Sequence, residues 1–330
     1  MNIFIDESGS FATHRSRCHS LSAVGALIVP EWQSKQLLKK YAKLRPSLPK
    51  DKGEVKGRLL NEAQVSRVLE LLRKNSCIFE GVVIDMGLET EEGLERHRTG
   101  QAGGLTDELT DEHHPDVVAA VKAKRAQLDA MPLSLYVQSV LTRHLIWEVL
   151  KLLPIYWAQR VPREILNYHW VIDGKEVGRV TNVEDWWSTT MLGLIESRSY
   201  QDRMPRVEGI DYTDFDAKFL RERTAWHKKK MPGPGTALDL RLLLKESFRF
   251  SSDPEPGLEL VDIVTNATRR ALAGNLQAAG WTGIPRLMIN RREQCLSIVT
   301  ITSDIERAKR PYAVILARGF RSGGRSMLVK

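Results

Sequence analysis

The sequence predicts an α/β fold in which a β-sheet is flanked by helices. Short apolar runs that end in glycine or proline are typical of buried strands, and one of them, Asn-Ile-Phe-Ile-Asp-Glu-Ser-Gly, occupies residues 2–9. A second run at 167–174, Asn-Tyr-His-Trp-Val-Ile-Asp-Gly, repeats the order of apolar residues, aspartate and glycine. Between and after these runs lie segments whose apolar residues recur at helical spacing, and these segments are expected to cover the sheet.

The first 86 residues show clear signals for strands and helices. Pro30 follows an apolar run and cannot continue a central ladder, so residues 3–29 are expected to form a hairpin. Asn61-Glu62-Ala63-Gln64 has the pattern of a capping box, which marks the start of a helix. The expected elements in chain order are a strand at 21–29, a helix at 31–45, a helix at 61–74 and a strand at 79–86.

The later part of the chain contains two polar insertions. Residues 87–131 are acidic and rich in glycine, and we expect a partly mobile insertion there, in which His113 and His114 belong to a surface loop. Residues 200–237 form the second insertion, which is basic. The other expected elements are a helix from Pro132 to just before Pro154, a half-buried strand from Leu238 to Phe250, a helix at 258–273 and a last strand at 294–301.

Length and composition indicate an ordinary globular protein. We expect one elaborated domain over residues 1–330, because no linker divides the chain. No apolar run approaches the roughly 20 residues that a membrane helix needs, and the apolar segment 23–30 lacks the flanks of a signal peptide, so we expect no membrane association and a cytoplasmic location. Three isolated cysteines indicate neither a disulfide framework nor a zinc site.

The net charge of +8 favours a polyanionic partner. Positive charge is concentrated at 221–230, where an aromatic ring lies among the cations, and this mixture suits phosphate contact and base stacking. The alternative is that these cations form a solvated face without a partner. The residues we expect to contact nucleic acid, whether RNA or DNA, are Arg221, Arg223, Trp226, Lys228, Lys229 and Lys230.

Carboxylates recur at the ends of the predicted elements. Asp6 and Glu7 end the first strand, and Asp173 ends the strand at 167–173. On the helix at 258–273, Glu259 and Asp262 share one polar face with Asn266 and Arg269, because these residues are separated by three or four positions. A structural explanation exists for each carboxylate alone, since an Asp-Glu pair can simply cap a turn.

Four segments resemble the family named domain of unknown function 3800, and they span nearly the whole chain. They are Phe4-Ile5-Asp6-Glu7-Ser8-Gly9, Glu54-Val55-Lys56-Gly57, Val171-Ile172-Asp173 and Gly257-Leu258-Glu259-Leu260-Val261-Asp262. The resemblance implies a ribonuclease H-like fold, in which acidic residues from the first strand, a central strand and the last core helix converge at one edge of a mixed sheet. The chain departs from the family at Glu259 and Val261, where glutamine and alanine are expected.

Three converging carboxylates would repel one another by roughly 1 to 4 kcal/mol per pair at about 4 Å, so they require protonation or a cation. Mg²⁺ or Mn²⁺ would satisfy this requirement, and two such ions can promote phosphodiester hydrolysis. In this interpretation Asp6 bridges two metal ions, Asp173 and Asp262 each hold one, and Glu259 is a further candidate metal ligand that makes the site more acidic. Glu7 or Glu54 would orient the attacking water or complete the coordination shell of a metal ion. Lys56 would neutralise the scissile phosphate.

Two other functions stay open at this point. The acidic pocket could be vestigial in a nucleic-acid- or protein-binding module of a bacterial mobile-element or antiviral system. Hydrolysis or transfer on a smaller phosphorylated substrate is disfavoured, because the aspartyl-phosphate pattern requires an aspartate where this chain has Ser8.

Overall fold

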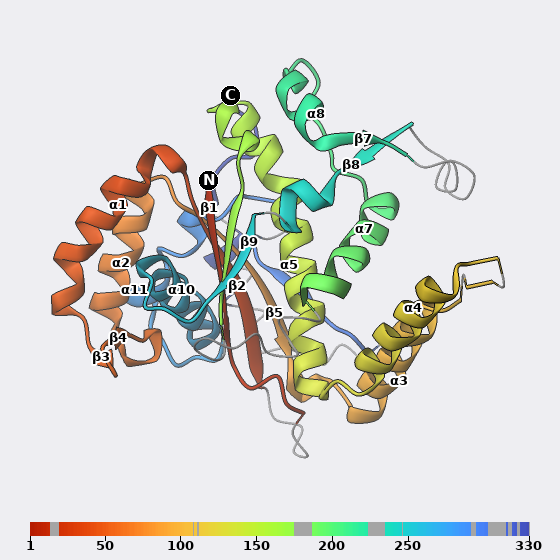
Figure 1. Cartoon of the computed structure of the whole chain (residues 1–330). Helices are drawn as coiled ribbons and strands as arrows, with labels where there is room; N and C mark the ends of the chain where they lie inside the picture. The colour runs from red at the N-terminus through yellow and green to blue at the C-terminus, as the bar shows by residue number, and fades with distance from the viewer. Residues whose placement is uncertain are drawn as a thin grey trace.

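A six-stranded mixed sheet runs through the molecule between two groups of helices (Figure 1). The structure is a computed structural model, and it describes residues 1–13, 20–107, 109–110, 112–174, 187–223, 235–245, 247–291, 295–302, 315, 319–321 and 324–329. Across the sheet the strands follow the order β10 (Ser297–Val299), β5 (Ile78–Asp85), β2 (Leu21–Val29), β1 (Asn2–Ser8), β6 (His169–Asp173) and β9 (Phe248–Ser251).

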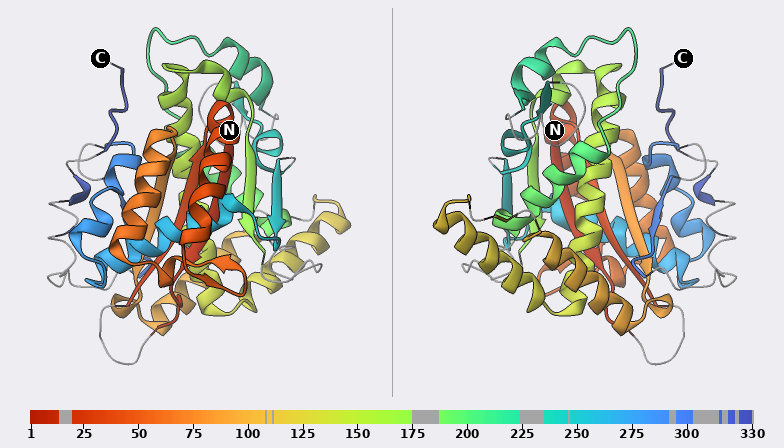
Figure 2. Two further views of the ribbon diagram at one scale, coloured as in Figure 1. Left: turned by 90° about the vertical axis from the view of Figure 1, so that its left-hand side faces the viewer. Right: turned by 90° about the vertical axis from the view of Figure 1, so that its right-hand side faces the viewer.

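Helices cover both faces of this sheet. The helices on the two sides come to the front in the two views of Figure 2, with α1, α2 and α10 in one view and α5 and α7 in the other. The principal helices are α1 (Glu31–Leu44), α2 (Glu62–Lys74), α3 (Glu91–Gly104), α4 (Pro115–Asp129), α5 (Leu133–Ala158), α7 (Leu192–Gln201), α8 (Thr213–Phe219), α10 (Pro256–Leu272) and α11 (Ala278–Trp281). None of the helices in the described ranges is both long enough and apolar enough to cross a membrane.

Strand β1 determines which residues face which helices. It pairs antiparallel with β2 and parallel with β6, so it lies inside the sheet with both neighbours hydrogen-bonded. Because successive side chains of a strand point to opposite faces, Ile3 and Ile5 enter the core formed with α5, while Phe4 packs against the core formed with α10. The alternation places Asp6 and Ser8 on the same face as Phe4.

Helix α10 approaches β1 closely because a glycine faces the strand. A Cβ atom on Gly257 would overlap the ring of Phe4. Gly257 lies in the first turn of α10, directly after Pro256, whose fixed φ suits the start of a helix. The absence of a side chain at residue 257 therefore sets how closely the helix and the sheet can pack.

Three predictions about local structure were wrong. Residues 87–131, where we expected a partly mobile insertion and predicted no helix, contain helices α3 and α4, capped by Thr90 and His114. Few of their residues are buried, so they show little hydrophobic periodicity. The helix α5 continues through Pro154 to Ala158, because its last turns bury a run of large apolar side chains that offsets a proline cost of roughly 3 kcal/mol.

The third error concerns residues 238–250, which we expected to form one strand. Instead, strand β8 (Thr236–Leu238) ends at Leu238, the first residue of the predicted strand. A π-helical turn follows at Arg241–Lys245, and β9 begins only at Phe248. Asp239 causes the break, since its carboxylate accepts hydrogen bonds from the backbone amides of residues 241 and 242. Aspartate favours such local turns over a strand.

We predict that Gly257→Ala lowers the free energy of unfolding by about 1 to 3 kcal/mol, because the added methyl group pushes α10 away from Phe4. Gly100→Ala is the matched control, since Gly100 lies in α3 with no neighbouring atom near the position of a Cβ. That substitution should leave stability unchanged or raise it by about 0.5 to 1 kcal/mol. Urea denaturation of both variants tests the prediction, and equal effects would contradict it.

Candidate active site

The face of β1 that α10 covers carries the predicted carboxylates. At one end of the contact Gly257 meets Phe4, and at the other end Ser8 accepts hydrogen bonds from Asn266 (3.1 Å) and Arg269 (2.8 Å). Asp6 lies between Phe4 and Ser8 on the same strand face. Asp262 lies between Gly257 and Asn266 on the helix, so the packing directs it towards Asp6.

The sheet register brings Asp173 to the same level. Strands β1 and β6 are parallel, with Phe4 opposite Val171 and Ile5 opposite Ile172. Asp6 and Asp173 are the next residues of these two strands, and both follow a residue that faces α5. The two aspartates therefore lie at neighbouring positions of adjacent strands, on the α10 face of the sheet.

The pKa of Asp6 reflects its burial and the carboxylates around it. Burial raises its pKa well above the usual range, and the negative charges of Glu7, Asp262 and Asp173 raise it further. A hydrogen bond from the Glu7 amide to Oδ1, 2.7 Å long, opposes these effects without cancelling them. Asp6 is thus a carboxyl group that lacks enough positive charge nearby to stabilise its ionised form.

The negative charge of Asp262 is partly balanced by neighbouring hydrogen-bond donors and cations. Its Oδ2 accepts a hydrogen bond of 2.8 Å from the Gly57 amide. Burial raises the pKa of Asp262, whereas this hydrogen bond and the charges of Lys56 and Arg58 lower it, and the net direction is upward. Gly57 must be glycine for this contact, because a Cβ there would press against the backbone of α10 at Ile263, with a separation of 2.8 Å.

Strand β4 (Glu54–Val55) and Lys56 complete the charged surroundings. Lys56 forms an ion pair of 2.6 Å with Glu54. Burial alone would lower the pKa of Lys56, but Glu54, Asp262 and Asp173 raise it overall. Lys56 is therefore a charged ammonium group near the aspartates, where we expected a cation.

The structure does not support Glu259 as a metal ligand. Its carboxylate accepts hydrogen bonds from Arg45 (2.6 and 2.7 Å), from the Tyr41 hydroxyl (2.8 Å) and from the Val55 amide (2.9 Å). Burial works to raise the pKa of Glu259, and these donors lower it overall. Glu259 therefore joins α10 to α1 and β4, although the helical spacing correctly placed Asp262, Asn266 and Arg269 on one face.

The basic insertion only partly resembles the predicted cation surface. Arg221 forms an ion pair with Glu196, and Arg223 is buried. The other four predicted nucleic-acid contacts, Trp226, Lys228, Lys229 and Lys230, lie outside the described residues. Sequence reasoning did not identify the cavity of about 400 Å³ that Arg223 lines.

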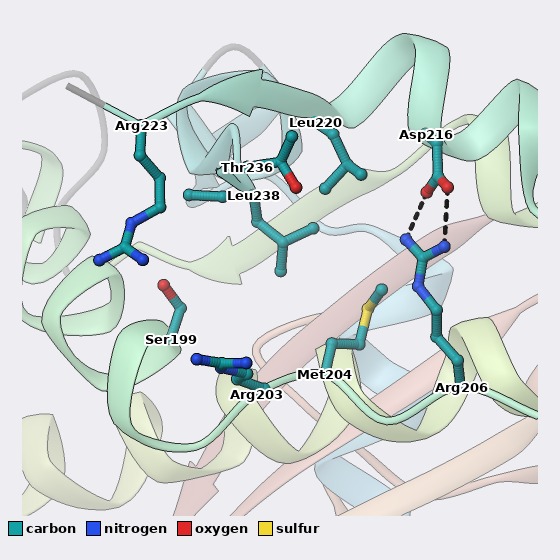
Figure 3. Close-up of a pocket in the computed structure, with 10 residues that line it drawn as sticks. Ser199, Arg203, Met204, Arg206, Asp216, Leu220, Arg223, Thr236 and Leu238 are labelled. Carbon is teal, nitrogen blue, oxygen red and sulfur yellow. Dashed lines mark hydrogen bonds and ion pairs between the residues drawn. The ribbon is translucent and has the colours of Figure 1, made fainter. Parts of the chain in front are cut away.

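Figure 3 shows this cavity between α7, β7 (Leu220–Glu222) and β8. Arg203 and Arg223 both extend towards Ser199, whereas Arg206 forms a bidentate ion pair with Asp216. Leu220 and Leu238 line the cavity and pack with the core on the α5 side of the sheet. The carboxylates lie on the α10 side, so a nucleic-acid strand that contacts both regions would have to pass around an edge of the sheet.

The aspartates do not yet form a closed metal site. In the part of the chain that the structure describes, no three acidic, histidine or cysteine side chains are close enough together to hold a metal ion. Asp6 and Asp262 each have one oxygen bound to a backbone amide and one oxygen without a hydrogen bond from the described residues. Coordination would require these side chains to move closer together.

Comparison with known proteins adds no relative. No family model matches the chain, and no curated protein or solved structure matches it.

We predict that Asp6→Asn stabilises the metal-free protein at neutral and alkaline pH. The folded-state pKa of Asp6 is raised, so wild-type stability falls as the pH rises from the unfolded value, about 3.9, through the folded value. Asparagine does not titrate, and the advantage of the variant should therefore shrink as the pH approaches 4. Melting temperatures in EDTA across this range test the prediction, with the exposed Asp214→Asn as control. A difference that does not depend on pH would contradict it.

Proposed function

We propose that the protein is a metal-dependent phosphodiesterase that cleaves nucleic acid at the Asp6, Asp173 and Asp262 site. The observation that carries the proposal is the packing of β1, β6 and α10, in which Asp6, Asp173 and Asp262 lie on one face of the sheet and the other two charges raise the pKa of Asp6. Three distant segments thus direct carboxylates to one place at a cost in electrostatic energy. Structural aspartates are not usually arranged in this way, whereas active sites often contain groups with strongly perturbed pKa values.

The fold supports the ribonuclease H-like part of the proposal. That fold brings acidic residues from the first strand, a central strand and the last core helix to one edge of a mixed sheet. In this chain the corresponding elements are β1, β6 and α10, and β1 and β6 are neighbours in the middle of the sheet. The resemblance to the domain of unknown function 3800 family belongs to the same proposal, since it rests on residues of these elements.

The donor set suits Mg²⁺ or Mn²⁺, because both prefer carboxylate oxygens. Asp6, Asp173 and Asp262 would hold the metal, and the bound ions would supply an activated water and stabilise the departing oxygen. A backbone amide donates a hydrogen bond to one carboxylate oxygen of Asp6, and another does so to Asp262. These bonds limit the rotation of both side chains. Lys56 offers an ammonium group for the scissile phosphate, and Glu7 and Glu54 can accept a proton from water or bind it.

One observation favours a second candidate function. Among the described residues, no three potential metal ligands lie close enough together to hold an ion. The carboxylates could therefore be vestigial in a module that binds nucleic acid or protein without cleaving it. Such a module would tolerate loss of the carboxylates. The two functions therefore differ in what Asp262→Asn does to binding and to cleavage.

We predict that Mg²⁺ or Mn²⁺ raises the melting temperature of the wild-type protein and that Asp262→Asn abolishes this shift. The same substitution should reduce cleavage of single- and double-stranded RNA and DNA substrates by about 100-fold or more, the scale of losing one preorganised electrostatic group. Thermal shift assays and gel-based cleavage assays measure the two effects. The exposed Asp214→Asn should change neither.

A wild-type protein that neither responds to divalent ions nor cleaves any of these substrates would overturn the phosphodiesterase proposal. If nucleic-acid binding then persists unchanged in Asp262→Asn, the binding module is the better description.

We predict that changing Lys228, Lys229 and Lys230 together to alanine lowers the affinity for duplex DNA and flattens its salt dependence. The slope of log K against log salt should become shallower by roughly 0.9 for each phosphate that the variant no longer neutralises. Fluorescence anisotropy at several salt concentrations measures the slope, and a triple substitution of Lys122, Lys124 and Arg125 in α4 provides a control of equal charge. An unchanged slope would exclude the 228–230 lysines from the interface.

A further inference from the structure

A second cavity, of about 200 Å³, lies among α3, α5, α7 and the end of β10. Its polar lining consists of His97 from α3, Arg143 and His144 from α5, and Arg198 from α7. Trp147 and residues 299–301 form most of the rest. None of the described lining residues is acidic, although the cavity contains two guanidinium groups.

Arg143 lines this cavity without a carboxylate partner from the part of the chain that the structure describes. Among the described residues it forms no ion pair, and its hydrogen bond to Gln101 Oε1 is long, at 3.4 Å. Burial lowers the pKa of Arg143, Tyr136 acts in the opposite direction, and the charge of Arg198 lowers the pKa further. A partly desolvated guanidinium group that faces a second cation is unfavourable unless an anion joins it.

The described carboxylates that act on these side chains all have hydrogen-bond or ion-pair partners, and among them only Asp202 pairs with a cavity arginine. They are Glu89, which accepts hydrogen bonds from residues 301 and 302, Glu148, which pairs with Lys151 and Arg291, and Asp202, which binds Trp147, Lys151 and Arg198. Asp202 lies 3.4 Å from Arg198, so it neutralises that guanidinium only in part. None of the three pairs with Arg143.

The two histidines do not add a fixed charge to the cavity. Burial lowers the pKa of His97, and Arg143 lowers it further. Burial also lowers the pKa of His144, with Lys151, Arg198 and Arg291 acting in the same direction and Glu148 against it. Neutral imidazoles can still donate an N–H group, and Nδ1 of His97 lies 2.6 Å from the Tyr136 hydroxyl, which orients the ring.

We propose that this cavity binds a small oxyanion of the phosphate class, held by Arg143 and Arg198 with the histidines beside it. Guanidinium groups match the oxygen spacing of phosphate and form strong charge-assisted hydrogen bonds with it. The volume corresponds to about six or seven water molecules at roughly 30 Å³ each, and it lies below the roughly 300 Å³ at which pockets for larger ligands begin. Inorganic phosphate or a compact phosphomonoester fits these limits.

This site is separate from the carboxylates. The cavity is built on α5, which packs against β5 and β2, whereas Asp6, Asp173 and Asp262 lie under α10. The proposal therefore does not depend on phosphodiesterase activity, and Asp262→Asn should bind phosphate as the wild type does.

Isothermal titration calorimetry of the full chain with inorganic phosphate, in chloride buffer of matched ionic strength, tests the proposal. Wild-type protein should show saturable binding near one site per chain. Arg143→Met and Arg198→Met should each weaken it by at least about tenfold, since each variant loses charge-assisted hydrogen bonds to the anion. Arg125→Met in α4, where Arg125 pairs with Asp129, should bind phosphate as the wild type does.

Absence of saturable phosphate binding in the wild type would overturn the proposal, as would wild-type affinity in both arginine variants. Should Arg143→Met fail to fold, Arg198→Met decides alone, because that side chain is about half exposed and its loss leaves the core intact. A titration with a short oligonucleotide distinguishes the source of the anion. If the oligonucleotide binds through Arg143 and free phosphate does not, the cavity is part of a polynucleotide surface and the small-oxyanion site is wrong.

Discussion

The packing of α10 across β1 is the constraint on which the candidate active site depends. Two contacts of different kinds fix it: the steric fit of Gly257 against Phe4 and the hydrogen bonds from Asn266 and Arg269 to Ser8. Together they determine both the rotation of the helix and its position along the strand. Asp262 consequently faces Asp6, and the cost of bringing these carboxylates together is met by contacts elsewhere along the same interface.

Two clusters of like charge lie on opposite faces of the sheet. Beneath α10 lie carboxylates whose pKa values are raised, and on the α5 side lie arginines, one of which has a lowered pKa. The net charge of +8 alone does not reveal this separation. Without a bound metal ion or anion, each cluster destabilises the folded protein, because like charges lie close together in partly desolvated surroundings.

The sequence predicted much of this arrangement where strong local patterns coincide with tertiary contacts. The strands that carry Asp6 and Asp173, the capping box at Asn61 and the helix that carries Asp262 lie where we expected them. Sequence patterns did not predict the role of a residue when that role depends on a contact with a distant part of the chain. The partners of Glu259 are more than 200 positions away, and Arg143 is informative only because no acid among the described residues pairs with it. An Arg-His pair in a mostly apolar helix was the available clue to that cavity.

The anchoring of Glu259 has an evolutionary consequence. Its carboxylate binds Arg45, which directly follows α1, and the amide of Val55, two residues before the glycine whose amide positions Asp262. A neutral side chain at residue 259 would leave the Arg45 guanidinium without its counter-charge, so residues 45 and 259 should covary among homologues. Lineages with glutamine at 259 would then need a different way to hold the loop that steers Asp262.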